Sequence, residues 1–576
     1  MKKIAVVFVT IGLIILSAFL YLHYSISTPG FTPAQAEDSV TNTKPSQSFI
    51  DLKPKLTEKL QQLVKQGSNG LYNLFIHELN PDILNSTIGI SNASLVPDSA
   101  VMHQLEQSMQ LPNEVFKIQT DSIWIDGLGI KDILSKDVID VKAIHILSPT
   151  IEVYSKKNND PGTPSKTLYQ RLMNQMKHIG IGRVVIHNGT LISHGANKNK
   201  PTKLNDIYAN LTNIKIDSNT QFDKSRFLYA KDAEISTKNY SVPTSNHLYT
   251  LKVGLITIKT TKQLLVAKNI FLQPHHSKQE FQKHITAQKE RYSISIPSIE
   301  FRNTDWWNLI NNETLQAKHV QINRADISVY LDRRKPIGAM DLRGFPHQLI
   351  MKLPLKINIE KLKVNQLDIV YEELSKLSGQ TGKVHVDNLQ GTLYNLTNIP
   401  DAIKRNKTTK VSASGVLMNL APVSLNLTFD LSKYKSGAFS AGLKTKKGFD
   451  GTSINSVAEP LGMFSVKRGE LQELTSQVNG DNNKASAQVL LFYKDLHITP
   501  LKKDPANPGE LKKKSVTSLI ANKFVLKDEN PSKDGQIRKV DASFTRQYGT
   551  FFNLIWKTTF VGILKTIGAP EKIASQ

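Results

Sequence analysis

Apolar and polar residues alternate with a period of two along much of this sequence, and this alternation restricts the fold more than any other feature. Side chains along a β-strand point to opposite faces in turn, so such a run predicts a strand with one apolar face. The clearest runs are two sets of apolar residues separated mostly by polar ones: Val423, Leu425, Leu427, Phe429 and Leu431, and Leu353, Leu355, Ile357 and Ile359. The chain is therefore expected to be mainly β.

Helical spacing is limited to short stretches. Leucines between residues 53 and 79 recur at three- and four-residue intervals on both sides of a Gly-Ser-Asn-Gly sequence at 67–70, which predicts two short amphipathic helices. Further short helices are expected at 100–109, 167–179 and 279–291. So few helices cannot cover the apolar faces of many strands. Either sheet packs on sheet, or one sheet curls around an apolar trough, and periodicity does not separate the two.

The N-terminus carries a candidate membrane anchor. Residues 4–22 contain no charge, and about 19 helical residues at about 1.5 Å each match the hydrocarbon thickness of a bilayer. Lys2 and Lys3 precede this run, so the positive-inside rule keeps the N-terminus cytoplasmic and exports the rest. A cleaved signal peptide is the alternative, because Ala34-Gln35-Ala36 has the form of a cleavage site. We expect a signal anchor at 1–24 followed by a flexible stalk at 25–50.

Composition excludes several chemistries. The 576 residues contain no cysteine, which rules out disulfides, thiolate metal sites and cysteine nucleophiles. The net charge of +24 would make nucleic acid the first partner to consider in a cytosolic protein. The basic residues occur in short scattered runs, however, so we expect no nucleic acid partner. We interpret these runs as parts of solvated loops. The alternative is that they attract anionic lipid headgroups or acidic envelope glycans weakly.

An internal repeat supports the β interpretation. Residues 116–154 align without gaps onto 292–330, matching Ile118 with Ile294, Ile123 with Ile299 and Ile151 with Ile327 among others. A shorter echo follows, because the sequence at 320–327 resembles that at 362–369. Chance similarity between two alternating strands is the alternative explanation. The repeat divides the body into a helical and β N-terminal cap at 51–115, a first repeat at 116–290 and a second at 291–410.

Residues 411–505 resemble the C-terminal β module of the AsmA-like family of bacterial envelope proteins. The resemblance rests on Ala413-Ser-Gly415, Pro422 with the alternating strand after it, Phe439 before a turn, Ser465-Val-Lys467-Arg-Gly469, Gly480 and the strand at 485–496. These are patterns of strands and turns rather than reactive residues. The resemblance implies an inner-membrane anchor and a periplasmic, elongated, twisted and curled antiparallel sheet that forms an apolar groove. It also implies an architecture similar to that of bridge-like lipid-transfer proteins.

The expected groove residues are the nine apolar residues of the two alternating runs. An acyl chain costs about 0.8 kcal/mol per CH₂ in water, and a continuous apolar groove would shelter it while the headgroup stays wet. The function expected from the resemblance is phospholipid handling at or between envelope membranes, in support of outer-membrane homeostasis. An envelope scaffold or assembly factor for outer-membrane proteins is the main alternative, and an anchored hydrolase is a third. The body is short for crossing a periplasm unaided, so a protein partner or a local role is also open.

The C-terminal tail, 506–576, contains a predicted amphipathic helix at 549–567. Its candidate membrane-contact residues are Phe552, Trp556, Phe560 and Ile563. Lys557 and the threonines beside it interrupt the apolar run, so we expect no second membrane span. The helix is expected either to dock on a membrane or partner, or to cover the last part of the sheet.

Searches for catalytic and metal motifs find none. His275-His276 lacks spaced carboxylates, and His77-Glu78 lacks the second histidine of a zinc-binding helix. The sequence contains no nucleophile elbow, phosphate-binding loop or dinucleotide fingerprint. We therefore expect no catalytic residue, no metal and no cofactor.

Overall fold

The computed structural model describes residues 52–569, apart from 129–137, 156–177, 195–200, 338–343, 514–525 and the positions 69, 83, 109, 113, 245, 313, 354, 506, 508–509 and 547–548. The expected anchor and stalk lie outside the described residues, as does the expected helix at 167–179 except for its last two positions. In the part of the chain that the structure describes, no helix combines the length and the hydropathy needed to cross a membrane.

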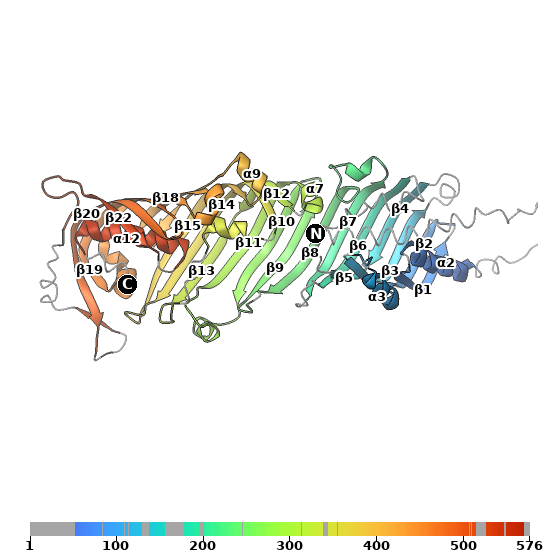
Figure 1. Cartoon of the computed structure of the whole chain (residues 1–576), viewed down its shortest axis with the longest axis horizontal. Helices are drawn as coiled ribbons and strands as arrows, with labels where there is room; N and C mark the ends of the chain where they lie inside the picture. The colour runs from blue at the N-terminus through green and yellow to red at the C-terminus, as the bar shows by residue number, and fades with distance from the viewer. Residues whose placement is uncertain are drawn as a thin grey trace, which may run out of the picture. The chain divides into compact units, whose positions relative to one another are not determined.

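The fold is mainly β, with a mixed sheet of 22 strands and a few short helices (Figure 1). The chain divides into two compact units. Unit 1 comprises the chain up to Ser241 with Val253–Val266 and Asp305–Glu313, and unit 2 comprises the remainder. The two units are described separately below.

Unit 1 contains a series of strands with short helices at its start and end. Its elements, in chain order, are α2 (Leu52–Gly67), β1 (Tyr72–Asp82), β2 (Thr87–Pro97), α3 (Ser99–Gln107), β3 (Glu114–Leu128), β4 (Val138–Leu147), β5 (Thr150–Ser155), β6 (His178–His194), β7 (Thr202–Ile216), η1 (Thr220–Phe222), most of β8 (Ala230–Pro243) and α7 (Trp306–Asn311). The strands β9 (Tyr249–Lys259) and β10 (Leu264–Pro274) each contribute to both units.

Unit 2 contains the remaining strands and the C-terminal helix. Its elements are α6 (Lys278–Phe281), η2 (Gln282–His284), β11 (Arg291–Thr304), β12 (Thr314–Ile322), β13 (Ala325–Asp332), α8 (Pro346–Met351), β14 (Lys356–Leu374), β15 (Thr381–Thr397), α9 (Pro400–Arg405), β16 (Thr408–Leu417), β17 (Ala421–Asp430), η3 (Leu431–Ser436), β18 (Phe439–Asp450), η4 (Gly451–Ile454), α10 (Asn455–Gly462), β19 (Phe464–Gly480), β20 (Lys484–Lys503), β21 (Leu511–Lys513), β22 (Lys539–Thr545) and α12 (Phe551–Ile567).

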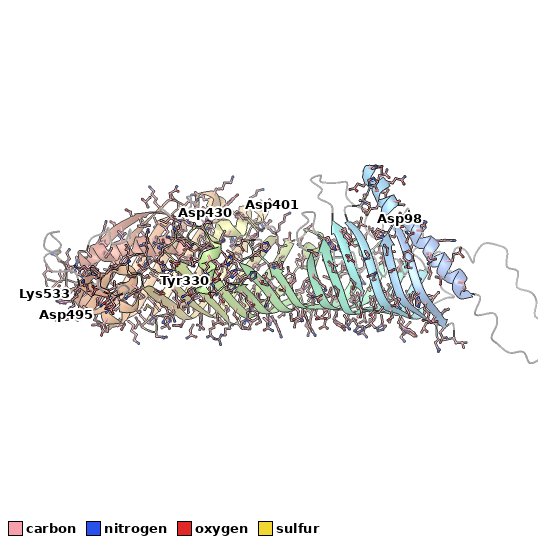
Figure 2. The ribbon with its side chains drawn as sticks, turned by 90° about the horizontal axis from the view of Figure 1, so that it is seen from below. Asp98, Tyr330, Asp401, Asp430, Asp495 and Lys533 are labelled. Atoms are coloured by element: carbon pink, nitrogen blue, oxygen red, sulfur yellow. The ribbon has the colours of Figure 1, made fainter. Side chains whose placement is uncertain are left out.

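The expected helices are confirmed in part. Helix α3 lies where 100–109 predicts it, and the side chain of Asp98, labelled in Figure 2, accepts hydrogen bonds from the amides of Ala100 and Val101 at its N-terminus. The second helix expected between 71 and 79 is wrong, because this segment is strand β1. Its backbone pairs with β2, which aligns Leu74 with Leu95, and Gly70 at φ +81° lies in the turn between α2 and β1. The stretch at 279–291 forms only the short α6 and η2 before β11 begins.

The internal repeat corresponds to a shared topology that occurs once in each unit. In unit 1, β3 pairs antiparallel with both β4 and β5, and β4 and β5 then both pair parallel with β6. In unit 2, β11 pairs antiparallel with β12 and β13, and both of these pair parallel with β14. Each short pair, such as β12 and β13, therefore forms one interrupted strand.

These parallel pairs correct the expectation of an antiparallel sheet. Parallel neighbours need a crossover connection of a dozen or more residues, and residues 333–355 between β13 and β14 supply one that includes α8. The strand alternation predicted the strands themselves, but strand direction depends on the connections. The resulting sheet is mixed.

The register explains why the sequence repeats. Ile118 pairs with Ile151 in unit 1, and their repeat equivalents Ile294 and Ile327 pair in unit 2. The echo has the same basis, because Ile327 lies directly beside Ile369 in the parallel pair. Equivalent positions on neighbouring strands point to the same face, so similar residues there build continuous rows of side chains.

Candidate functional site

Unit 2 presents an apolar face that runs across its strands without a break. Aligned residues on neighbouring strands point to the same side, and the printed registers of β11, β12, β14–β20 and β22 link them into rows. One row consists of Phe301, Val320, Leu362, Leu393, Val411, Leu427, Ala441, Val478, Ala487 and Ala542. The row beside it consists of Ile299, Ile322, Val364, Gly391, Ala413, Leu425, Leu443, Ser476, Val489 and Val540.

The opposite face of the same strands is polar. Lys361 and Tyr394 alternate with Leu362 and Leu393 along β14 and β15, and the Lys361 ammonium lies 5.6 Å from the centre of the Tyr394 ring. Ser412 on β16 is exposed on this side. The sheet of unit 2 therefore has one apolar and one solvated face, as the alternation predicts.

The apolar face is covered at its C-terminal end by α12. Figure 1 shows this helix lying across β20 and β22. Its residues Phe551, Leu554 and Ile555 form a buried cluster with Leu427 and Phe429 on β17 and with side chains of β18, β19 and β20. This result agrees with the expectation that the helix covers the last part of the sheet.

Small and polar residues bring α12 close to the sheet. A Cβ atom on Gly562 would lie 2.4 Å from Cγ2 of Val489, so only glycine allows this approach. The hydroxyls of Ser476 on β19 and Thr559 on α12 are both buried and form a hydrogen bond of 2.8 Å. The helix is thus fitted to this part of the apolar face.

The face changes from covered to partly exposed along the sheet. Leu427, Ala441, Val478 and Ala487, which lie near α12, are at most 5% exposed. Among the earlier members of the same row, Phe301, Leu362, Leu393 and Val411 are partly exposed, whereas Val320 is 3% exposed and Phe301 and Leu362 pack against its cluster. Strands β11–β16 therefore present some aliphatic side chains that are neither fully packed nor freely solvated, around a small buried cluster of Ala317, Val320 and Ile359.

The structure separates the nine predicted groove residues into groups. Leu353 and Leu355 precede β14 and are exposed, and Ile357 and Ile359 are buried on β14, where Ile359 packs against Ala317 and Val320. Val423 and Leu425 lie partly exposed on β17.

The other three of these nine residues are buried. Leu427 and Phe429 belong to the cluster beneath α12, so the structure places them in packed core rather than on an open surface. Leu431 is also buried, and it begins η3, since strand β17 ends at Asp430.

The partly exposed members of the rows on β11, β12, β14 and β15 were missed by the sequence reasoning. Strands β14 and β15 are interrupted by shifts in register, for example between Val364 and Leu367 on β14, and such shifts break the simple alternation. The signal that could have found them is the echo between 320–327 and 362–369, because it marks residues that lie side by side on one face.

The four membrane-contact candidates on α12 differ in their exposure. Phe552 and Trp556 are 58% and 48% exposed, whereas Phe560 and Ile563 are partly buried against the core of unit 2. The Trp556 and Phe560 rings stack with their centres 5.5 Å apart. Only the first two therefore offer exposed aromatic surface.

Unit 1 also has rows of aliphatic residues on one face. One row consists of Ile90, Ile123, Ile146, Ile186 and Ala209, and the next of Ile88, Ile125, Ile144, Val184 and Leu211. All ten are buried. These rows form the core of unit 1.

The described residues do not bring together a metal site. Among them, no group of three or more His, Asp and Glu side chains is placed to hold a metal ion. The His275 ring bonds to the carbonyl of His247 and to the hydroxyl of Thr250, and His276 stacks on His284 with ring centres 3.8 Å apart. The histidine pair is thus accounted for by local packing.

Comparisons of this chain with protein-family models and with curated proteins found no match.

Proposed function

We propose that the chain is a membrane-anchored lipid-binding protein whose acyl-chain site is the partly exposed apolar face on β11–β16. The observation that carries the proposal is the continuity of the aliphatic rows across these strands together with their partial exposure. Burial of an acyl chain there is favourable by about 0.8 kcal/mol per CH₂. The residues proposed to contact it most directly are Leu362, Leu393 and Ala413, with Val423 and Leu425 nearer to α12.

Partial exposure favours a trough over a closed sandwich. In a sandwich, the inner faces of two sheets interdigitate and their residues are fully buried. The strand pairs β14–β15 and β15–β16 contain register shifts. Where such shifts are β-bulges, they bend the strands and increase their twist. We infer that this bending curls the sheet enough to shelter the aliphatic residues without excluding a ligand.

The rest of the proposal follows from the sequence. Residues 4–22 would anchor the chain in a bacterial inner membrane with its body in the periplasm. The AsmA-like pattern at 411–505 supports a role in phospholipid handling for outer-membrane homeostasis. Since α12 covers one end of the apolar face, the chain would hold lipid along β11–β16 rather than offer an uninterrupted path past β20.

Photocrosslinking from neighbouring positions tests the proposal in the full chain. Leu393 and Tyr394 are adjacent on β15 but point to opposite faces, so p-benzoylphenylalanine at each position forms a matched pair. We expect irradiation in cells to attach phospholipid at position 393 and little at 394. Equal, low attachment at both positions in a folded protein would refute lipid binding and favour a protein scaffold.

A further inference from the structure

One edge of the sheet in unit 2 is strongly basic. Strands β14–β19 pair antiparallel in sequence, so every second connection lies at the same edge. The connections at one edge contain α8, α9 and η3, and we call them the basic rim: 344–355, 398–407 and 431–438. The rim contains six Lys and Arg residues and one Asp. The connections at the opposite edge contain one Lys and one Glu: 375–380, 418–420 and 451–463.

Hydrogen bonds hold the three connections of the basic rim together. The side-chain amide of Gln348 on α8 donates a hydrogen bond of 2.8 Å to the carbonyl of Tyr434 in η3. The amide of Leu431 donates one of 2.7 Å to the carbonyl of Lys407, which joins η3 to the connection that contains α9. All six cations of the rim are exposed: Lys352, Lys404, Arg405, Lys407, Lys433 and Lys435. The rim therefore presents its charge to solvent as one surface.

The basic rim also exposes large apolar side chains. Leu349, Leu353 and Leu355 are 53%, 46% and 38% exposed, and the exposed Lys352 lies among them in the sequence. Their exposure is costly in water, because each leucine leaves apolar surface unburied. Leucines enter the headgroup region of a bilayer, whereas lysines beside them reach the phosphates of anionic lipids. This combination is complementary to an anionic membrane surface.

We propose that the basic rim docks on a membrane that contains anionic phospholipid. The three leucines enter the headgroup region, and the six cations face the lipid phosphates. The docking needs only a membrane surface, so it goes beyond the proposed acyl-chain site. It would also bring the membrane to the start of β14, because Leu355 directly precedes the strand that carries Leu362.

A fluorescent label on the rim tests the docking. The chain contains no cysteine, so Leu353→Cys in the full chain accepts a single NBD label. The labelled protein is held in phosphatidylcholine nanodiscs and mixed with vesicles of brominated phosphatidylcholine, with or without phosphatidylglycerol. Leu377→Cys is the matched control, because Leu377 is 40% exposed at the opposite edge. We expect bromine to quench the label at 353 only when phosphatidylglycerol is present, and not to quench the label at 377.

Charge variants test the electrostatic part of the docking. Lys433→Gln combined with Lys435→Gln should weaken vesicle binding about thirtyfold, at about fivefold for each cation removed from an anionic surface. Lys376→Gln combined with Lys502→Gln removes two exposed lysines from the opposite edge and should leave binding unchanged. Equal weakening in both double variants would overturn the assignment of docking to the rim.

The remaining outcomes separate this docking from the proposed function. Absence of quenching at 353 with phosphatidylglycerol vesicles would overturn the docking, and a blue shift of the label without quenching would assign the rim to a protein contact instead. Phospholipid attached by p-benzoylphenylalanine at position 393, with no quenching at 353, would leave acyl-chain binding intact. Quenching at 353 with no attachment at 393 would support the docking and count against the acyl-chain site.

Discussion

We predict that His347 makes the stability of unit 2 dependent on pH. It lies in α8, is 1% exposed and stacks on Phe429 with ring centres 4.7 Å apart. Neither ring nitrogen has a hydrogen-bond partner among the described residues. Burial lowers the pKa of His347 from 6.5 to about 4, so the folded protein keeps the ring neutral where the unfolded chain would protonate it.

The sign and size of the effect follow from this difference. Because the folded-state pKa is the lower one, the contribution is fully present above pH 6.5 and is lost as the pH falls towards 4. The gap between the two pKa values corresponds to about 3 kcal/mol in total, at about 1.4 kcal/mol for each tenfold change in proton affinity. About 2 kcal/mol of this should be lost by pH 5.

Hydrogen exchange of peptides from α8, β17 and α12, corrected for the intrinsic rate at each pH, measures the local opening free energy. His347→Phe keeps an aromatic ring beside Phe429 and removes the titrating group. In this variant, the local opening free energy should therefore stay constant between pH 7.5 and pH 5. His319→Phe, at an exposed position on β12, should behave as the wild type. The reasoning is refuted if His347→Phe and wild type lose the same free energy on acidification.

Three further changes test the packing described above. Gly562→Val places side-chain atoms where Val489 already lies, so we expect α12 to lose about 1–3 kcal/mol of protection in hydrogen exchange; wild-type protection would contradict the close approach. Ser476→Ala should cost about 1–3 kcal/mol in denaturant unfolding by leaving Thr559 without its buried partner, and adding Thr559→Val should recover part of that loss; simple additivity would argue against the bond. Asp98→Ala should cost α3 about 1 kcal/mol, seen as faster exchange limited to that helix; no change would argue against the cap.

Much of the strand content could be predicted from the sequence, because alternation is a local property. The run at 423–429 alternates because its residues face two different environments, and the structure places it in β17. The repeat was also readable, since Ile294 and Ile327 pair as Ile118 and Ile151 do. The helical spacing of the leucines gave a wrong prediction at 71–79, because pairing with β2 makes this segment a strand.

The residues of the candidate site could be predicted from the sequence only in part. Alternation identified Val423 and Leu425, but it gave no reason to separate them from Leu427, which is buried under α12. Leu393 and Leu362 escaped notice because register shifts interrupt the alternation around them.

The sequence by itself determined that this chain forms strands with one apolar face and contains an amphipathic helix after them, since both features follow from the periodicity of neighbouring residues. Only the tertiary structure decided the direction of the strands, which depends on crossover connections such as the one between β13 and β14. It also decided which apolar residues are covered and which stay accessible. That outcome depends on where α12 packs, more than 100 residues after the strand β17 that it covers.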